Sequence, residues 1–362
     1  MKILAVSPVP NYATRDVWTG HVNGLRELGA EVLAMNYSKI WTLYADFHEM
    51  SIVTGRAEFG SIDATLLSSE RIFMAAVVND VDLVYMVAPM HVSPTVLKLM
   101  TKLKEIYGTK LAACFTECPY DDTSWQLDFA ELMDYSFISD QISLPAFKEK
   151  CPNSFYVGHA YDPNLHKPLQ NGHVRDIDVL ATMTLFPSRT QFLEKVDWSE
   201  IDLHLYGILP IGNQSPLHPY VRGSAMTNPE LARLYQDTKV GFNLHRNDNI
   251  TGARLMKAVE RGERGILGAV PNPDLKADSI GPRCYELAAC GVFQVCDDSR
   301  KELQEVFGDT VPTYRTPEEL EALLREYVSD PVKREEAAKK QREAVEPFTF
   351  KYRMTTVMEA VS

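Results

Sequence analysis

The sequence predicts an α/β fold with two doubly wound parallel sheets, in two domains that face each other across a cleft. Three observations support this prediction. Apolar runs of strand length alternate with helix-length segments along the chain, which indicates parallel strands joined by crossover helices. The chain has 362 residues, too many for one ordinary hydrophobic core. Apolar residues make up 45% and charged residues 24%, the balance of a globular protein.

The first domain is expected to span residues 1–165. Its opening run KILAVS is a buried-strand pattern, followed by a loop and a helix that ends near Gly29. The later patterns are the strand EVLAMN, a helix over 66–78, the strand DLVYMV, the helix SPTVLKLMTKLKEIYG, the strand KLAACF, a helix after the polar loop TECPYDDTS, the strand YSFI, a helix over 140–150 and the strand SFYVG. Open α/β sheets bind ligands at the carboxyl ends of their strands, so the loops at those ends are candidate sites.

A stretch of low periodicity, HAYDPNLHKPLQNGHVRD, contains Pro163, Pro168 and Gly172 and is interpreted as the linker. The second domain is expected over 170–347. Its patterns are the strand DIDVLAT, the helix RTQFLEKV, the strand DLHLYG, the helix NPELARLYQD, the strand KVGFNLH, a short apolar helix, the strand VFQVC, the helix RKELQEVFG and an amphipathic run over 317–345. A last helix over 348–362 is expected to pack back on the first domain.

Several classes of protein are excluded by composition. No apolar run approaches the ~20 residues of a membrane span, and the N-terminus lacks a signal-peptide pattern. The six cysteines are scattered, and Cys114 and Cys118 have no second close pair or histidine to complete a zinc spacing. Reduced, packed thiols in a cytoplasmic protein are therefore expected. The net charge of −12 argues against a surface that broadly coats nucleic acid, but it leaves room for one basic groove.

The stretch GPRCYELAACGVFQVCDDS, at 281–299, points to a site. Arg283 and Glu286 stand at the start of an apolar helix that ends at Gly291. Backbone N–H groups and the dipole at a helix start attract anions. An arginine there suits a diphosphate through bidentate contacts, and a carboxylate one turn later can accept two ribose hydroxyls. The competing explanation is a glutamate that stabilises the helix dipole beside a surface arginine, and charge placement alone favours neither.

The segment from RCYELAACG to the end of the amphipathic run resembles the donor domain of GT-B glycosyltransferases in the group-1 superfamily. It is most similar to the CgeB-like, spore-maturation branch. Further stretches resemble that branch: TECPYDD, DYSFISD, YVGHAYDPNLHKP, DIDVLATMTLFPSRTQFLEKV and KVGFNLHRND. The resemblance covers residues 111–360 well and the first hundred residues in outline. It implies the GT-B fold, with two Rossmann-like domains.

The resemblance implies an enzyme, a hexosyltransferase-type glycosyltransferase that moves a sugar from a nucleotide-sugar to an acceptor. Glu286 would bind the nucleotide ribose and Arg283 would lie near the donor phosphates. In the superfamily a second acidic residue precedes the ribose glutamate by eight positions and approaches the sugar, and Asp278 occupies that position here. The expected catalytic residues are Arg189, Arg246, His91 and Asp278. The expected donor-binding residues are Glu286, Arg283, Gly20, His21 and Cys284.

The first domain would supply the acceptor surface. Gly20 and His21 lie at the first loop and helix start, where the superfamily brings backbone close to the donor. His91 follows the strand DLVYMV at its carboxyl end, and Glu117 and Asp121 lie on another strand-end loop as expected acceptor-side residues. Each has a competing explanation as an ordinary polar residue, because most strand ends are polar.

A metal is not expected, and no further cofactor is required. The resemblance implies that arginines and helix dipoles hold the diphosphate, and the aspartates of NDVDL and RDIDV have no neighbouring ligands. No glycine-rich phosphate loop follows the first strand, which argues against a dehydrogenase or an ATPase. A UDP-sugar such as UDP-glucose is the favoured donor, and the branch implies retention of anomeric configuration.

The acceptor stays open among a small molecule, a glycan, a protein and a hydroxymethylated pyrimidine in DNA, and the oligomeric state is unknown. The DNA alternative depends on the run RLMKAVERGERG, in which four basic residues fall along one helical face: Arg254, Lys257, Arg261 and Arg264. The competing explanation is a solvated helix face whose glutamates offset this charge. Alternatives of another class are a nucleotide-sugar epimerase and a non-catalytic nucleotide-sugar-binding protein.

Overall fold

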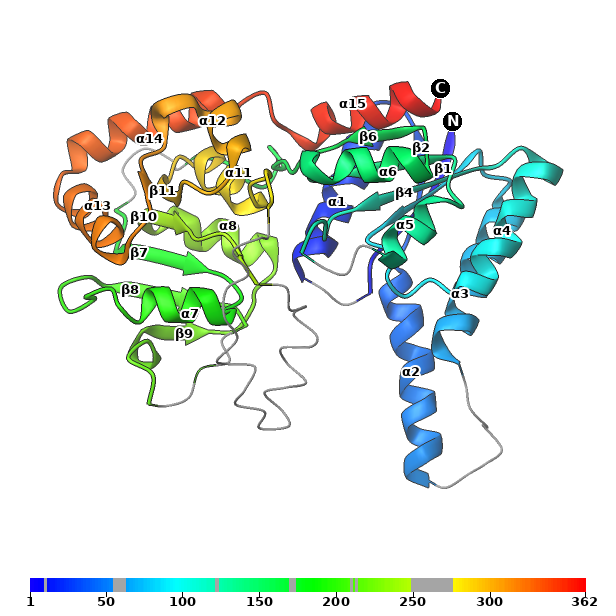
Figure 1. Ribbon diagram of the computed structural model, residues 1–362, viewed down its shortest axis with the longest axis horizontal. Coiled ribbons are helices and arrows are strands. Elements are labelled where there is room, and N and C mark those ends of the chain that lie inside the picture. Colours follow the sequence, from blue (N-terminus) through cyan, green and yellow to red (C-terminus); the bar gives the residue numbers. More distant parts are fainter. Residues whose placement is uncertain are drawn as a thin grey trace. The chain divides into compact units, whose positions relative to one another are not determined.

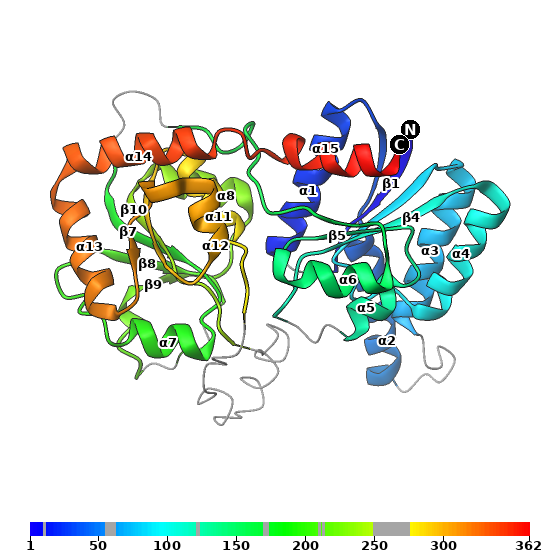
Figure 2. The ribbon, with the colours of Figure 1, turned by 45° about the horizontal axis from the view of Figure 1, so that its top comes forward.

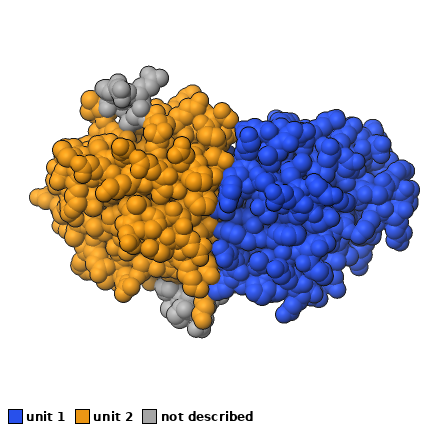
Figure 3. All heavy atoms as spheres, turned by 90° about the horizontal axis from the view of Figure 1, so that it is seen from above, with its two compact units in different colours: residues 1–118, 122–158, 350–362 blue, residues 119–121, 159–349 orange. Residues whose placement is uncertain are grey.

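The computed structural model describes residues 1–9, 12–54, 63–120, 124–168, 174–208, 211, 214–248 and 276–362. The chain forms two compact units, coloured separately in Figure 3. Unit 1 consists of Met1–Cys118, Asp122–Gly158 and Phe350–Ser362, and unit 2 of Pro119–Asp121 and His159–Thr349. The chain therefore leaves unit 1, builds unit 2 and returns for its last helix.

Unit 1 is built on a six-stranded parallel sheet with the order β2-β1-β3-β4-β5-β6. Its strands are β1 (Lys2–Val6), β2 (Glu31–Met35), β3 (Leu83–Val87), β4 (Lys110–Phe115), β5 (Tyr135–Ile138) and β6 (Ser154–Tyr156). Its helices are α1 (Tyr12–Glu27), α2 (Tyr37–Thr54), α3 (Ala64–Asn79), α4 (Pro94–Tyr107), α5 (Ser124–Ala130), α6 (Leu144–Lys150) and α15 (Phe350–Val361). The strand order reverses between β1 and β3, so the loops after these two strands flank the switch point.

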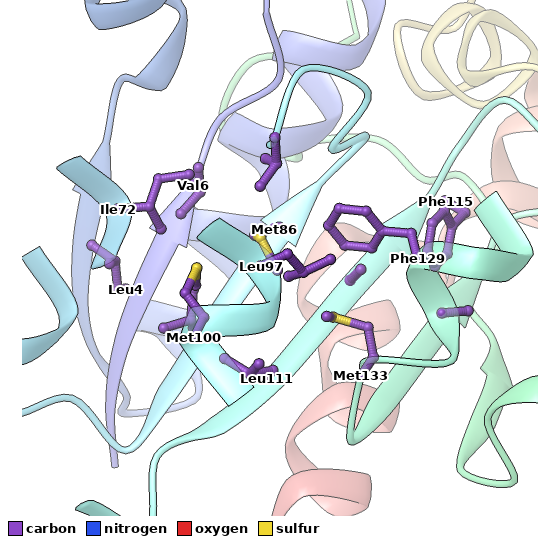
Figure 4. Packing of buried hydrophobic residues seen from close by; sticks show 14 of the residues in the cluster. Leu4, Val6, Ile72, Met86, Leu97, Met100, Leu111, Phe115, Phe129 and Met133 are labelled. Carbon is purple, nitrogen blue, oxygen red and sulfur yellow. The ribbon is translucent and has the colours of Figure 1, made fainter. Parts of the chain in front are cut away.

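The core of unit 1 lies between its sheet and helices α3 to α6, and Figure 4 shows its packing. Alternate side chains of β1, Leu4 and Val6, enter this core, as the two-residue period of a strand requires. Ile72 of α3 and Met100 of α4 meet them there, and both are fully buried. Asp63 fixes the start of α3, because its carboxylate accepts a hydrogen bond from the backbone N–H of Leu66 at 2.9 Å.

The last helix, α15, packs against α1, and Figures 1 and 2 both show the two helices side by side. Two glycines of α1 make this contact close. A Cβ atom added to Gly20 would lie 2.2 Å from Cδ2 of Phe350, and one added to Gly24 would lie 2.8 Å from the Phe350 carbonyl oxygen. The absence of a side chain at these positions therefore lets the two helices meet.

Unit 2 repeats the architecture with the strand order β12-β11-β10-β7-β8-β9, again parallel throughout. Its strands are β7 (Ile177–Thr182), β8 (Leu203–Tyr206), β9 (Val221–Gly223), β10 (Thr238–Asn243), β11 (Phe293–Asp297) and β12 (Thr313–Tyr314). Its helices are α7 (Pro187–Leu193), α8 (Asn228–Gln236), α11 (Pro282–Ala289), α12 (Lys301–Phe307), α13 (Pro317–Ser329) and α14 (Pro331–Val345). The order reverses between β7 and β10, which is where such a sheet binds its ligand.

Hydrophobic clusters cover both faces of the second sheet. Val179 and Ala181 of β7 pack in one cluster, and Leu180 between them packs in another. Helix α11 begins at Pro282, whose fixed φ and missing N–H suit a first helical position. It is followed by Gly291 at φ 69°, a left-handed conformation that glycine adopts without strain.

The predicted α/β class with two doubly wound, Rossmann-like parallel sheets is confirmed. The amphipathic run over 317–345 forms two helices, because Asp330 caps a new helix that begins at Pro331. Within the described residues, no helix is both long and apolar enough to cross a bilayer.

Candidate functional site

Three arginines meet at the switch point of the unit 2 sheet. Arg189 lies in α7, which follows β7, and Arg246 follows β10, while Arg283 lies in the first turn of α11. Burial, together with the positive charges of Arg246 and Arg283, lowers the pKa of Arg189 to about 10. The group remains charged at neutral pH, so the three guanidinium groups repel one another. Such a concentration of like charge favours the binding of an anion.

Arg189 and Arg283 are anchored at the carboxyl end of β7. Nη1 of Arg189 donates to the carbonyl oxygen of Thr184 at 2.9 Å, and Nε of Arg283 donates to the hydroxyl of Thr182 at 2.6 Å. Nε of Arg189 is buried and has no hydrogen-bond partner among the described residues. A buried donor without a partner is costly, and a bound anion would relieve this cost.

Arg246 is held by aromatic rings. Its guanidinium carbon lies 4.4 Å from the ring centroid of Phe186 and 5.0 Å from that of Tyr120, a residue that groups with unit 2. Its Nε donates to the carbonyl oxygen of Asp248 at 2.9 Å. Cation–π contacts of this kind fix the plane of the guanidinium group.

A fourth arginine, Arg300, joins this group and was missed by the sequence prediction. Its Nη2 donates to the carbonyl oxygen of Arg246 at 2.7 Å and to the hydroxyl of Tyr120 at 3.3 Å. The side chain is only 5% exposed, and its Nε has no partner among the described residues. The available signal was its position directly after the strand that ends at Asp297.

Glu286 lies one turn after Arg283 and is buried. Its Oε1 accepts from Nδ2 of Asn228 at 3.2 Å, and its Oε2 accepts from the hydroxyl of Tyr235 at 3.2 Å. Burial and the charge of Glu286 raise the pKa of Tyr235, which keeps this hydroxyl protonated as a donor. The carboxylate is thereby held in one orientation, and each oxygen retains acceptor capacity for a further hydroxyl.

Cys284 belongs to an internal cluster with His245, Cys296 and Asp297. Nδ1 of His245 lies 3.0 Å from Oδ1 of Asp297 and 3.7 Å from Sγ of Cys296. Burial opposes protonation of His245, but the Asp297 carboxylate outweighs it and raises the pKa of the imidazole to about 9. The cluster therefore stabilises positive charge in its interior. A direct contact of Cys284 with a donor stays a prediction.

Asp278 precedes α11 in the chain and contacts the first turn of α12. Its backbone carbonyl accepts from the N–H of Glu302 at 3.0 Å, and its Oδ2 lies 3.5 Å from Nζ of the exposed Lys301. These contacts place it beside the first turn of α12. Its approach to a sugar stays a prediction.

Three predicted residues of the first domain, Gly20, His21 and His91, lie in unit 1. His21 is buried in α1, and its Nδ1 lies 3.0 Å from the hydroxyl of Tyr85 in β3. Its ring lies 5.6 Å from that of Phe350, so Gly20 and His21 both contact α15. His91 lies after β3, beside the unit 1 switch point, where its ring is 5.0 Å from that of Trp41. Burial lowers the pKa of His91.

The predicted acceptor-side pair lies partly outside the described residues, and the predicted basic group lies wholly outside them. Glu117 follows β4 and is half-buried. Asp121 lies outside the described residues, as does the basic group of Arg254, Lys257, Arg261 and Arg264. The roles predicted for all of them stay predictions.

Comparisons with known proteins find one matching family and several similar folds. A family described as glycosyl transferase-like matches residues 189–359, somewhat less than half of the chain. A sequence search of curated proteins finds no match. The match begins at Arg189 and contains Arg246, Arg283, Glu286 and Arg300.

Solved structures resemble the whole chain. Anabaena HepE in complex with UDP and glucose has a TM-score of 0.60 at 14% identity, over 99% of this chain and 98% of that one. Sucrose-phosphate synthase from Thermosynechococcus elongatus has a TM-score of 0.58 at 10% identity, over 99% and 98%. T4 phage β-glucosyltransferase has a TM-score of 0.53 at 14% identity, over 100% of both chains. At these identities the likeness shows the fold.

Proposed function

We propose that this chain, a glycosyltransferase with the GT-B fold, transfers a sugar from a UDP-sugar to an acceptor hydroxyl. The observation that carries the proposal is the group of arginines at the unit 2 switch point, with the buried carboxylate of Glu286 one helical turn away. HepE, which has a similar fold, has been solved with UDP and with UDP-glucose. The motifs around RCYELAACG favour the CgeB-like branch within this class.

In this proposal the arginines bind the donor diphosphate and Glu286 accepts hydrogen bonds from the ribose hydroxyls. As the bond between the anomeric carbon and the phosphate oxygen breaks, negative charge grows on the UDP leaving group. Arg189, Arg246 and Arg283 stabilise that charge, and a divalent ion is not needed for it. The acceptor oxygen bonds to the anomeric carbon, and its proton passes to the phosphate oxygen of the departing UDP. Retention of configuration is proposed from the family resemblance.

The first experiment is a thermal-shift screen of UDP, GDP and their sugars, followed by calorimetry with the best binder. We expect UDP-sugars to raise the melting temperature, since a ligand that binds only the folded state stabilises it. The matched variants are Arg283→Ala and Arg222→Ala. Arg222 is a surface residue of the same unit that lies 3.7 Å from Asp202. Equal donor affinity in the two variants, or no nucleotide-sugar binding at all, would contradict the proposal.

Turnover separates this reaction from the two alternatives of another class. A glycosyltransferase releases UDP faster when acceptor is present, an epimerase converts the donor without acceptor, and a binding protein does neither. Trials of small-molecule, glycan and protein acceptors with the best donor therefore decide among them. UDP release that no acceptor accelerates would count against the transferase.

DNA is proposed as a second candidate acceptor because the similar folds include a β-glucosyltransferase described as a DNA-modifying enzyme, with a TM-score of 0.57 at 14% identity. The net charge of −12 would repel a duplex, so binding would depend on the local basic run at 254–264. Its four basic side chains would give an affinity that falls with salt at a slope of about −0.9 per phosphate contact. Duplexes with and without hydroxymethylated pyrimidines, tested across a salt series, provide the measurement. Full activity in a variant with all four residues changed to Glu would exclude this route.

A further inference from the structure

Three side chains of types that can bind a metal ion lie together inside unit 2. Their spacing in the sequence does not match a known metal-binding motif. His245 follows β10, Cys284 lies in the first turn of α11, and Cys296 lies in β11. One potential ligand atom from each lies within 4.8 Å of the others. The two cysteines are fully buried and His245 is 7% exposed.

The contacts of this cluster gather around Nδ1 of His245. Nδ1 of His245 faces Oδ1 and Oδ2 of Asp297 at 3.0 and 3.2 Å, and Sγ of Cys296 at 3.7 Å. A protonated Nδ1 can donate to the carboxylate while the thiols bond elsewhere, and a deprotonated Nδ1 can bind a metal ion instead. A cation bound by Nδ1 and the two sulfur atoms would take the place of their protons. Nε2 of His245 is also buried without a partner among the described residues.

We propose that His245, Cys284 and Cys296 bind one zinc-class metal ion, and that Asp297, which contacts His245 but lies outside this group of three, moves in as the fourth ligand. Two sulfur atoms, one imidazole nitrogen and one carboxylate oxygen form a donor set that suits Zn²⁺ and not Mg²⁺ or Ca²⁺. Zinc bond lengths place tetrahedral ligand atoms about 3.3–3.8 Å apart, and the contacts of Nδ1 at 3.0 to 3.7 Å are close to that range.

The fourth ligand is held by outer contacts. Oδ1 of Asp297 accepts from the backbone N–H of Ser299 at 3.2 Å and from its hydroxyl at 2.5 Å. The backbone N–H of His245 donates to Oδ2 of the same carboxylate. Contacts of this kind orient a ligand carboxylate around a metal. Because all four side chains are buried, the site is closed and the ion is structural.

The ion would position the arginines of the candidate site. Every ligand except Cys296 is close in sequence to one of those arginines. The pairs are His245 and Arg246, Cys284 and Arg283, and Asp297 and Arg300. A single ion would therefore join the loop after β10, the start of α11 and the end of β11. This consequence rests on the proposed function, whereas the metal site does not.

The test measures metal directly. Tag-free protein purified without chelator is analysed for zinc by mass spectrometry, and stripped protein is reloaded with Co²⁺ for absorption spectroscopy. We expect about one zinc per chain, thiolate-to-cobalt charge-transfer bands and the visible bands of tetrahedral cobalt. Cys284→Ser and Cys296→Ser should lower zinc content at least about tenfold, since thiolates are the metal's preferred ligands here. Cys290→Ser is the matched control, because Cys290 is equally buried in α11's C-terminal cap and lies outside the cluster.

Three results would overturn the metal site. The first is that wild-type protein takes up no zinc from an equimolar solution. The second is a cobalt spectrum without thiolate bands. The third is a Cys284–Cys296 disulfide mapped in protein purified without air. The wild-type cobalt spectrum decides the matter if the serine variants do not fold. Calorimetry with UDP on the zinc-loaded protein tests the proposed function independently of the metal site. A loaded protein that binds no nucleotide would refute the proposed function and leave the metal site standing.

Discussion

Nε of Arg283 donates to the hydroxyl of Thr182 at 2.6 Å, and this bond ties the first turn of α11 to the carboxyl end of β7. The two residues are 101 positions apart in the sequence. The bond involves Nε, so the edge of the guanidinium group that carries both Nη atoms can still form a two-pronged contact with a phosphate. Thr182 thus orients a charged group that the proposed donor would meet.

We expect Thr182→Val to weaken UDP binding about three- to tenfold, because it removes one hydrogen bond that orients a charged side chain. The fold should persist, since valine has nearly the shape of threonine. Calorimetry with UDP measures the effect, and Thr182→Ser should restore most of the affinity by returning the hydroxyl. Equal affinity in the valine and serine variants would mean that Arg283 does not depend on Thr182.

Glu286→Gln should weaken UDP binding by about tenfold or more, because a hydrogen bond to a charged group contributes about 1.5–3 kcal/mol. Glutamine has the same size, so the variant avoids the cavity that alanine would leave. Tyr235→Phe is the control, since it removes a hydrogen-bond partner of the carboxylate without removing its charge. If donor affinity fell only in Tyr235→Phe, Glu286 would not bind the ribose.

Arg189→Lys and Arg246→Lys should lower kcat more than they raise KM. Both side chains would meet a charge that is larger in the transition state than in the bound donor. Lysine keeps the charge but lacks the planar guanidinium group that can form two parallel hydrogen bonds. At position 246 it would also lose the stacking on Phe186 and Tyr120. Steady-state kinetics across donor concentrations measure the split, with Arg222→Ala as reference. A change confined to KM would assign both residues to donor binding alone.

Gly20→Ala should destabilise unit 1 by about 1–3 kcal/mol, as overpacking of a filled contact does. The added Cβ would lie 2.2 Å from Cδ2 of Phe350. The same substitution in a Phe350→Ala background should be neutral or stabilising, because alanine is favoured over glycine within a helix by about 1 kcal/mol. Urea unfolding of the four variants measures this coupling. Additive effects would mean that Phe350 is not the obstacle.

Much of the fold could be predicted because strand periodicity is local. The run VFQVC, bounded by Gly291, contains most of β11, and Pro282 marks the start of α11. Helix α2 was missed because its apolar residues do not form one stripe. Leu43, Phe47 and Met50 are all exposed in it, so the pattern that identifies an amphipathic helix is weak.

The candidate site was predictable only where residues lie beside a recognisable motif. Arg283 and Glu286 adjoin the start of α11, and Arg189 and Arg246 follow strands. Arg300 was overlooked because its importance depends on Tyr120, 180 positions away. The cluster of His245, Cys284 and Cys296 comes from three separate elements, so no spacing in the sequence could indicate it.

The route of the chain imposes an order on biosynthesis. Residues 1–158 emerge from the ribosome before α15 exists, because residues 159–349, nearly all of unit 2, are translated in between. Until then the glycine-lined surface of α1 has no covering helix and is open to chaperones or to misassociation. The N-terminal unit can therefore complete its core only after the second unit has been synthesised, although its sheet strands are made first.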